Sequence, residues 1–212
     1  MNIYRVLDRV LDSGTKIKIL RFLCRTNAEW NGRQIAKEIS VSPSICHKTL
    51  KGLLYEDVLL LKNTGKSFVY RLNSANIIVK GLLAPLFRAE ENIPKELFGI
   101  IRKELLKITK EGIISIAVFG SVSKKEEMPE SDIDIFVITT AAWKEKVERV
   151  FSDLSAKIHL RFGNTISPYI KSVDEFRREA KRQGMLIKNI MESHVLIYGL
   201  SLEGIINGGG KI

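Results

Sequence analysis

The residues with the clearest potential for chemistry are two aspartates, Asp132 and Asp134, which are separated by one residue in an apolar stretch. They alternate with Ile133, Ile135 and Val137, which predicts a β-strand. Residues two apart on a strand point to the same face, with Cα atoms roughly 6.5 Å apart. Two carboxylates on one face can hold one or two divalent cations, and Mg²⁺ (or Mn²⁺) prefers a few carboxylates with phosphate oxygens and water. Two ions about 4 Å apart can activate an attacking hydroxyl and stabilise a leaving pyrophosphate.

A Gly-Ser pair, Gly120-Ser121, follows the apolar run Ile113–Phe119. Glycine permits close backbone approach to a phosphate, and the serine hydroxyl and nearby N–H groups can bind its oxygens. Ten residues, 122–131, separate Ser121 from Asp132. We expect this loop to return the chain to a neighbouring strand and to place the carboxylates beside a phosphate cradle. The alternative is a structural strand that exposes two aspartates, but carboxylates among apolar residues are costly without cations.

The rest of the second half predicts the elements that would position these residues. They are a helix over 95–110, a strand over 113–119, a loop over 122–130, a strand over 132–139, a helix over 143–154, an extended or irregular segment over 157–162, a strand over 165–170, helices over 172–182 and 184–192, and a strand over 194–198. This order predicts a small mixed sheet flanked by helices.

The Gly-Ser pair and the Ser131-Asp132-Ile133-Asp134 strand resemble the DNA polymerase beta-like nucleotidyltransferase superfamily, especially its minimal prokaryotic members. The resemblance covers about residues 95–200. It implies that Gly120 and Ser121 bind the triphosphate of an NTP such as ATP. Minimal members often have an Arg or Lys-Gly shortly after the Gly-Ser pair, and this sequence departs from them by having Ser123, Lys124 and Lys125 there. Lys124 or Lys125 is therefore a candidate triphosphate contact, and Ser131 is a further candidate nucleotide contact. The resemblance also implies that Asp132 and Asp134 are catalytic ligands of Mg²⁺.

A second departure concerns a third carboxylate, which active members of that family usually carry on a later strand. The candidate strand, 165–170, contains no acid. Asp174 and Glu175 follow it, but they fit the first turn of a helix, where acids are favoured. The third acid commonly serves as general base or metal anchor, so its loss would weaken catalysis without abolishing nucleotide binding.

Charge is concentrated in the first half of the chain. The net charge is +10, and residues 1–90 hold 15 Lys+Arg against 7 Asp+Glu, a net of +8, while residues 91–212 hold 19 against 17, a net of +2. A basic half suits a partner with a phosphate backbone. A solubilising surface is the alternative explanation.

The first half predicts helices over 3–11, 15–25 (capped by Thr15) and 31–39, a helix over 42–55 that starts with Ser42 as N-cap and Pro43, and a β-hairpin over 58–72. Ile45 and Cys46 are expected on the inner side of the fourth helix. Residues 15–72 resemble winged helix-turn-helix regulators of the ArsR and MarR type, which implies a recognition helix at 42–55. The candidate DNA contacts are Ser42, Ser44, His47, Lys48, Lys51, Lys62 and Lys66.

These patterns together predict an α+β protein with a winged helix at 1–90 and a nucleotidyltransferase domain at 91–212. Helices over 75–89, with a kink or end at Pro85, and over 95–110 would flank the boundary at Asn92-Ile93-Pro94. The chain has no long apolar run or secretory signal, and its two cysteines, Cys24 and Cys46, fit reduced thiols, so we expect a cytoplasmic protein without a membrane partner.

The leading hypothesis is transfer of a nucleoside monophosphate from an NTP to a hydroxyl. The alternative is a transcription regulator whose transferase-like domain binds nucleotide or a partner without turnover. The winged helix is expected to bind double-stranded DNA, or else to serve as a protein-protein or homodimer module. Resemblance to small toxin-antitoxin members adds a HEPN-type partner protein as a third option.

Overall fold

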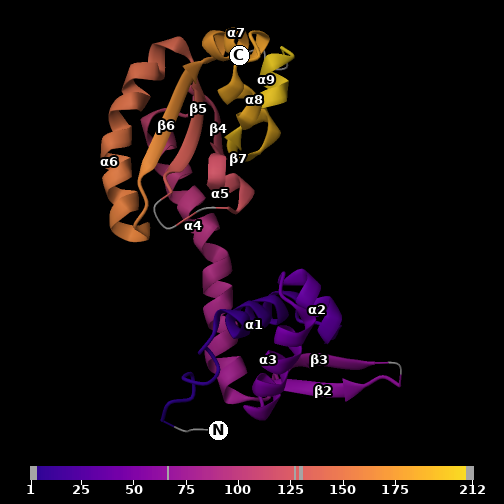
Figure 1. The fold of residues 1–212 in the computed structure, drawn as a ribbon. Helices are drawn as coiled ribbons and strands as arrows, with labels where there is room; N and C mark the ends of the chain where they lie inside the picture. Colours follow the sequence, from indigo (N-terminus) through magenta and orange to yellow (C-terminus); the bar gives the residue numbers. More distant parts are fainter. Residues whose placement is uncertain (1–3, 66, 127, 129–130, 209–212) are drawn as a thin grey trace. The chain divides into compact units, whose positions relative to one another are not determined.

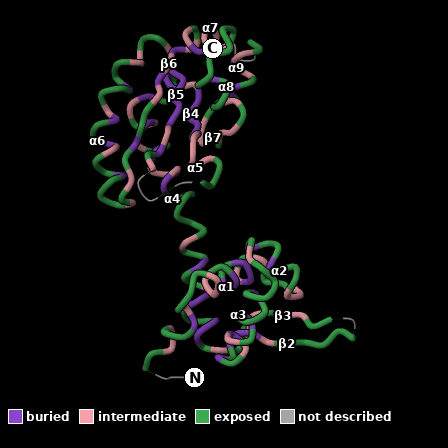
Figure 2. The backbone as a smooth tube through the Cα atoms, in the orientation of Figure 1, coloured by how far each residue is buried: buried purple, intermediate pink, exposed green. Residues whose placement is uncertain are grey.

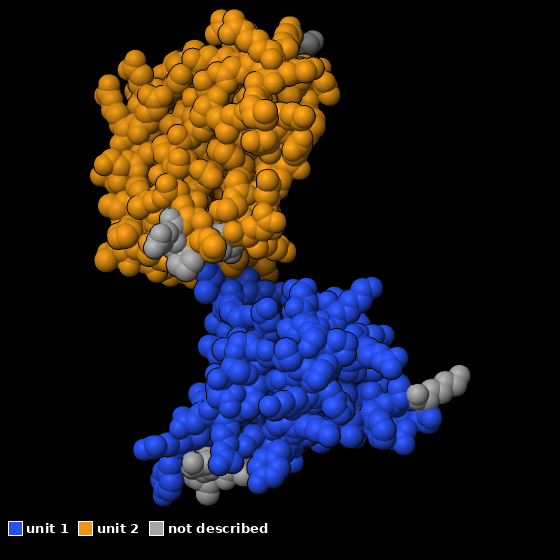
Figure 3. All heavy atoms as spheres, in the orientation of Figure 1, with its two compact units in different colours: residues 1–93 blue, residues 94–212 orange. Residues whose placement is uncertain are grey.

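The computed structural model describes residues 4–65, 67–126, 128 and 131–208. The chain divides into two compact units, Met1–Ile93 and Pro94–Ile212 (Figure 3). Each unit has its own buried apolar core. In the described part of the chain, no helix combines the length and the apolar character needed to cross a membrane. The predicted α+β fold class is confirmed.

The first unit is a winged helix (Figure 1). Its elements are α1 (Gly14–Thr26), β1 (Trp30–Asn31), α2 (Gly32–Glu38), α3 (Pro43–Tyr55), β2 (Leu59–Asn63), β3 (Phe68–Leu72), the π-helical turn η1 (Val79–Leu83) and the first part of α4 (Ala84–Ile108). β2 and β3 form the predicted antiparallel hairpin, and the short strand β1, which the sequence did not suggest, pairs with the free edge of β3.

Side-chain caps fix the starts of the three short helices. The Ser42 hydroxyl accepts a hydrogen bond from the Ile45 N–H at 3.3 Å, so the predicted cap of α3 is confirmed. Asn31 caps α2 in a reciprocal capping box with Gln34. α1 is capped by Ser13 and not by Thr15 as predicted, because the helix begins at Gly14, which places its N-cap two residues before Thr15.

The predicted helix over 3–11 is wrong. Its described residues form turns, and between residues 4 and 11 the bond from the Leu11 N–H to the Leu7 carbonyl is the one hydrogen bond with the i to i−4 spacing of an α-helix. Val10 is nevertheless buried, with Val6 and Leu7 packed against the core of the unit. The apolar stripe therefore reflects packing on that core, not helical hydrogen bonding.

The predicted break between two helices at 92–94 is also wrong. α4 runs without interruption through Pro94, which costs one N–H donor but leaves the flanking turns intact. The kink expected at Pro85 takes the form of η1, which widens the helix just before the proline. The boundary between the two units therefore lies within a continuous helix.

The second unit is built on a four-stranded sheet in the order β6-β5-β4-β7. Its elements after α4 are β4 (Ile113–Phe119), α5 (Gly120–Lys124), β5 (Ile133–Thr139), the 3₁₀ turn η2 (Ala141–Trp143), α6 (Lys144–Phe162), β6 (Ile166–Ser172), α7 (Val173–Lys181), α8 (Met185–Glu192), β7 (His194–Gly199) and α9 (Leu202–Ile206). β4 is antiparallel to β5 and β7, whereas β6 is parallel to β5, so the sheet is mixed as predicted.

Most of β5 is buried (Figure 2), and its alternating side chains contribute to two layers of the core of this unit. Ile133, Ile135 and Val137 pack with residues of α4 and α6 on one face. Phe136 and Ile138 pack with residues of α7, α8 and α9 on the other. Asp134 is two residues before Phe136 on the strand, so its side chain points to the same face as that of Phe136.

One further expectation for the second unit needs correction. The segment 157–162, predicted to be irregular, is the last part of α6, because Ile158 continues the buried stripe of that helix and Gly163, with φ +79°, ends it. The final helix α9 was not predicted. Asp174 and Glu175 do lie in the first turn of α7, as expected.

Candidate nucleotide site and nucleic-acid interface

The Gly-Ser pair and the aspartates meet at one end of the sheet. In the strand register, Asp134 stands opposite Phe119 of β4 on one side and Ser167 of β6 on the other. Gly120 follows Phe119 with φ +72°, and a Cβ atom there would lie 2.1 Å from Oδ2 of Asp134. The Gly120 backbone is therefore in direct contact with the carboxylate, an approach that only glycine permits.

The two aspartates differ in their surroundings. Asp132 is exposed just before β5 and accepts a hydrogen bond from the hydroxyl of Thr165. Asp134 is partly buried, and burial together with the negative charge of Asp132 raises the pKa of its carboxyl group. Thr165 was missed at the sequence level, because only the parallel pairing of β5 and β6 brings it beside Asp132.

This donor set fits a divalent cation. Two carboxylates that repel each other would both be stabilised in the charged form by a cation placed between them. Mg²⁺ is often held by one or two carboxylates with the remaining positions taken by water and phosphate oxygens. Asp132 and Asp134 are the residues that would hold it.

A hydrogen-bond lock holds α5 in place beside the pair. The hydroxyl of Ser123 lies 2.8 Å from the Gly120 carbonyl and 3.0 Å from the hydroxyl of Ser193, which lies between α8 and β7. Ser121 is half-buried in the first turn, and Lys124 is exposed in the last. Lys124 is three residues after Ser121, on neighbouring positions of the same helix face.

Ser131 shapes the end of the loop. Its hydroxyl accepts a hydrogen bond from the Met128 N–H at 2.9 Å, and its carbonyl accepts one from the side chain of Asn164 at 3.1 Å. With the described residues, the Ser131 hydroxyl makes no hydrogen bond as donor, and the predicted nucleotide contact stays a prediction.

A third carboxylate is absent from its expected place. β6 carries no acid, and the residue that faces Asp134 across the β5–β6 pairing is Ser167, which is exposed. Over the described ranges, no group of three His, Cys, Asp or Glu side chains is arranged to hold a metal ion. Glu175 is engaged elsewhere: the Ser172 N–H and the Lys144 ammonium bond to it and lower the pKa of its carboxyl group to about 2.

The exposed side of α3 carries the candidate nucleic-acid contacts. Five predicted residues are exposed on this helix or at its cap, namely Ser42, Ser44, His47, Lys48 and Lys51. Ile45, predicted to face inward, is 53% exposed among them, so that assignment is wrong. Lys62 is exposed on β2 and pairs with Glu29 at 3.2 Å, while Lys66 lies outside the described residues.

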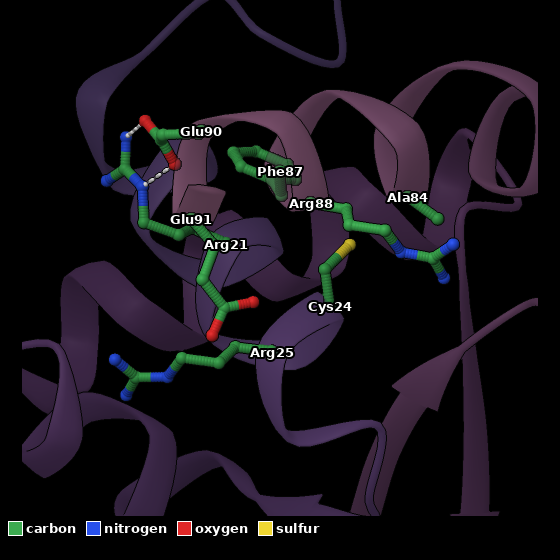
Figure 4. Close-up of a pocket in the computed structure, with 8 residues that line it drawn as sticks. All are labelled: Arg21, Cys24, Arg25, Ala84, Phe87, Arg88, Glu90 and Glu91. Carbon is green, nitrogen blue, oxygen red and sulfur yellow. Dashed lines mark hydrogen bonds and ion pairs between the residues drawn. The ribbon is translucent and has the colours of Figure 1, made fainter. Parts of the chain in front are cut away.

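A hollow of about 320 Å³ between α1 and α4 carries no comparable chemistry (Figure 4). Arg21 is held by Glu90 in a two-bond ion pair, and the guanidinium groups of Arg25 and Arg88 point to opposite sides. Burial raises the pKa of the Cys24 thiol to about 11, which keeps it protonated and unreactive.

Comparison with known proteins supports the reading of the second unit. Residues 103–201 match the model of the family described as "Polymerase beta, Nucleotidyltransferase". The match includes both Gly120-Ser121 and the two aspartates, so the predicted nucleotidyltransferase-family domain is confirmed over this range. No curated protein matches the chain.

Three solved structures show weaker similarity. One is the homodimeric winged helix-turn-helix DNA-binding domain of a possible ArsR-family transcriptional regulator from Mycobacterium bovis, at 19% identity and a TM-score of 0.35, covering 43% of this chain and 81% of that one. The others are a toxin-antitoxin with AMP-PNP and a mutant of the toxin-antitoxin MntA-HpeT, both at 16% identity, with TM-scores of 0.34 and 0.36, covering 53% of this chain and 82% of those. Similarity at this level says nothing about the activity of this chain.

Proposed function

We propose that residues 91–212 form a Mg²⁺-dependent nucleotidyltransferase domain and that residues 1–90 form a winged helix that binds double-stranded DNA. The observation that carries the first part is the contact between the Gly120 backbone and the Asp134 carboxylate, beside Asp132, within a domain that matches the nucleotidyltransferase family. The observation behind the second part is the exposed basic face of α3.

In the proposed reaction, the oxygen of an acceptor hydroxyl bonds to the α-phosphorus of an NTP. The bond from that phosphorus to the bridging oxygen of the β-phosphate breaks, pyrophosphate leaves, and the hydroxyl proton passes to solvent or a nearby base. Gly120 and Ser121 bind the β- and γ-phosphates, and Lys124 adds a positive charge. Asp132, oriented by Thr165, and Asp134 hold the cation, which when bound neutralises phosphate charge and lowers the pKa of the attacking hydroxyl.

The test is Mg²⁺-dependent binding of each NTP, followed by labelled-NTP incorporation into candidate protein, RNA and small-molecule acceptors. Asp134→Asn should abolish both, because it removes one of the two ligands of the cation. Asp153→Asn is the matched control, since Asp153 is exposed on α6 outside the site. Equal or undetectable nucleotide binding by wild type and Asp134→Asn would overturn the proposal.

A second candidate function follows from Ser167, which stands where a third carboxylate would face Asp134. In this second candidate function, the domain binds nucleotide without turnover, and the protein is a DNA-binding transcription regulator. DNA binding that changes with NTP while no label is incorporated favours this regulator, and turnover that Asp134→Asn abolishes favours the enzyme.

We also propose a homodimer through the first unit. Ile77, Leu82, Leu86 and Ile93 are exposed at intervals of about one turn or two along the helical segment that starts at residue 77. An apolar stripe of this kind is typical of a helix that packs against a partner. Sedimentation analysis should show a dimer that Leu82→Asp with Leu86→Asp converts to a monomer, and a wild-type monomer would exclude it.

A further inference from the structure

The first unit contains a hollow of about 630 Å³ between the starts of α2 and α3 and strand β3. Tyr70, only 5% exposed, belongs to its interior, whereas Phe68, at the start of β3, is 55% exposed. Arg33 of α2 and His47 of α3 also line it. A volume in this range is typical of sites for molecules of nucleotide size.

The charge of the hollow favours an anionic occupant. No carboxylate is among the described residues that line it. Arg33 and His47 are exposed, and neither side chain makes a hydrogen bond or ion pair with another described residue. Arg33 therefore offers donors of fixed positive charge, and His47 offers a ring N–H, to phosphate oxygens.

The combination of an exposed aromatic ring with such donors matches the chemistry of single-stranded nucleic acid. Unpaired bases stack on aromatic side chains while positively charged groups follow the backbone. A base inside a duplex is paired and stacked on both faces, so it cannot present a face to Phe68. The hollow therefore favours an unpaired base, either one flipped out of a DNA duplex or one in a single strand.

We propose that this hollow receives one unpaired base of a DNA strand, stacked on Phe68, with the adjoining phosphates contacted by Arg33 and His47. The proposal rests on nucleic-acid binding by the first unit and deepens it. His47 belongs both to the exposed face of α3 and to the hollow, so the two surfaces are continuous. The preferred partner is thus a duplex with a single-stranded overhang and not a blunt duplex.

The experiment uses the full chain with two short duplexes of the same sequence, one blunt and one with an overhang whose first unpaired base is 2-aminopurine. Wild type should bind the overhang more tightly and quench the 2-aminopurine fluorescence, because stacking on an aromatic ring quenches it. Phe68→Leu should remove the quenching and weaken overhang binding roughly 5- to 150-fold, the range that loss of one stacking contact gives. Blunt-duplex binding should stay within about twofold.

Control variants separate this role from a structural one. Phe68→Trp should restore quenching and affinity, since it keeps a stacking ring. Tyr55→Leu removes an aromatic side chain that is 79% exposed at the end of α3, outside the hollow, and should change neither readout. Arg33→Ala should weaken binding, whereas Lys18→Ala, an exposed cation on α1, should not.

The failure of this proposal is distinct from the failure of nucleic-acid binding. If wild type binds both duplexes equally and Phe68→Leu matches wild type, the base pocket is wrong while DNA binding by the winged helix stands. If Phe68→Leu weakens both duplexes to the same extent, Phe68 acts structurally and the pocket is again wrong. If neither duplex binds, both proposals fail.

Discussion

The substitution Gly120→Ala tests the candidate nucleotide site most directly. Gly120 adopts φ +72°, a conformation that costs an L-residue about 1–2 kcal/mol. The new Cβ would also lie 2.1 Å from Oδ2 of Asp134, so the carboxylate must rotate away. Leaving its rotamer costs Asp134 about 0.5–1.5 kcal/mol more. We therefore expect the second unit to lose about 1.5–3.5 kcal/mol of stability.

Gly163→Ala provides the matched control. Gly163 has φ +79°, yet nothing lies within 4 Å of its added Cβ, so this variant carries the backbone strain without the clash. Stability is read from the fluorescence of Trp143 during urea unfolding in a Trp30→Phe background, which leaves one of the two tryptophans of the chain. The difference in unfolding free energy between the two variants measures the displacement of Asp134.

Nucleotide binding should separate the two variants more sharply than stability. Changing the groups that orient the ligands of a metal typically costs about 10- to 100-fold in metal affinity or activity. We expect Gly120→Ala to lose Mg²⁺-dependent nucleotide binding by at least about tenfold, with Gly163→Ala close to wild type. Gly120→Ala that binds nucleotide as wild type does would refute the reasoning, because the contact with Asp134 would then have no bearing on the ligand.

Three other substitutions give simple outcomes. Ser167→Asp places a third carboxylate beside the pair and should tighten Mg²⁺ binding on the order of tenfold in a calorimetric titration, and unchanged or weaker binding would speak against the site. Hydrogen bonds from the Ser172 N–H and the Lys144 ammonium lower the pKa of Glu175 from 4.5 to about 2, so this carboxylate stabilises the fold above pH 4.5 and that stability is lost as the pH falls to about 2. Lys144→Met should lower Tm at neutral pH and flatten its fall between those two pH values, and an unchanged pH profile would contradict this. Ser42→Ala removes the cap of α3 and should cost about 0.5–2 kcal/mol by urea unfolding of the first unit, and a loss near zero would show that the cap is not needed.

Local patterns in the sequence were enough to predict that the Gly-Ser pair and the aspartates lie close together, and to predict most of the elements that carry them. The run Ile113–Phe119, the Gly-Ser pair and the alternating aspartates place both strands and their order, because strand parity and loop length leave few arrangements. The start of α3 at Ser42-Pro43 was equally predictable, because helix capping depends on residues that are adjacent in the sequence.

Features that depend on tertiary contacts were not predictable in this way. Pro94 signals a break by local rules, yet Leu97 and Ile101 beyond it are buried in the second core, and this packing outweighs one lost hydrogen bond. Thr165 reaches Asp132 only through strand pairing between segments 33 residues apart. Ile45 was assigned to the inner side by hydropathy alone, which does not determine the exact rotation of a helix.

The passage of α4 through Pro94 also shows where the chain tolerates division. Cutting a helix usually exposes new unsatisfied donors at the downstream end. Pro94 has no N–H, and proline is favoured at the first position of a helix, so a fragment that starts there begins with a residue suited to the position. Phe87 stays with the first core and Leu97 with the second. Pro94 therefore marks a position at which the chain could be divided, because each unit would keep its own core. Either unit could then be joined to another domain at this position.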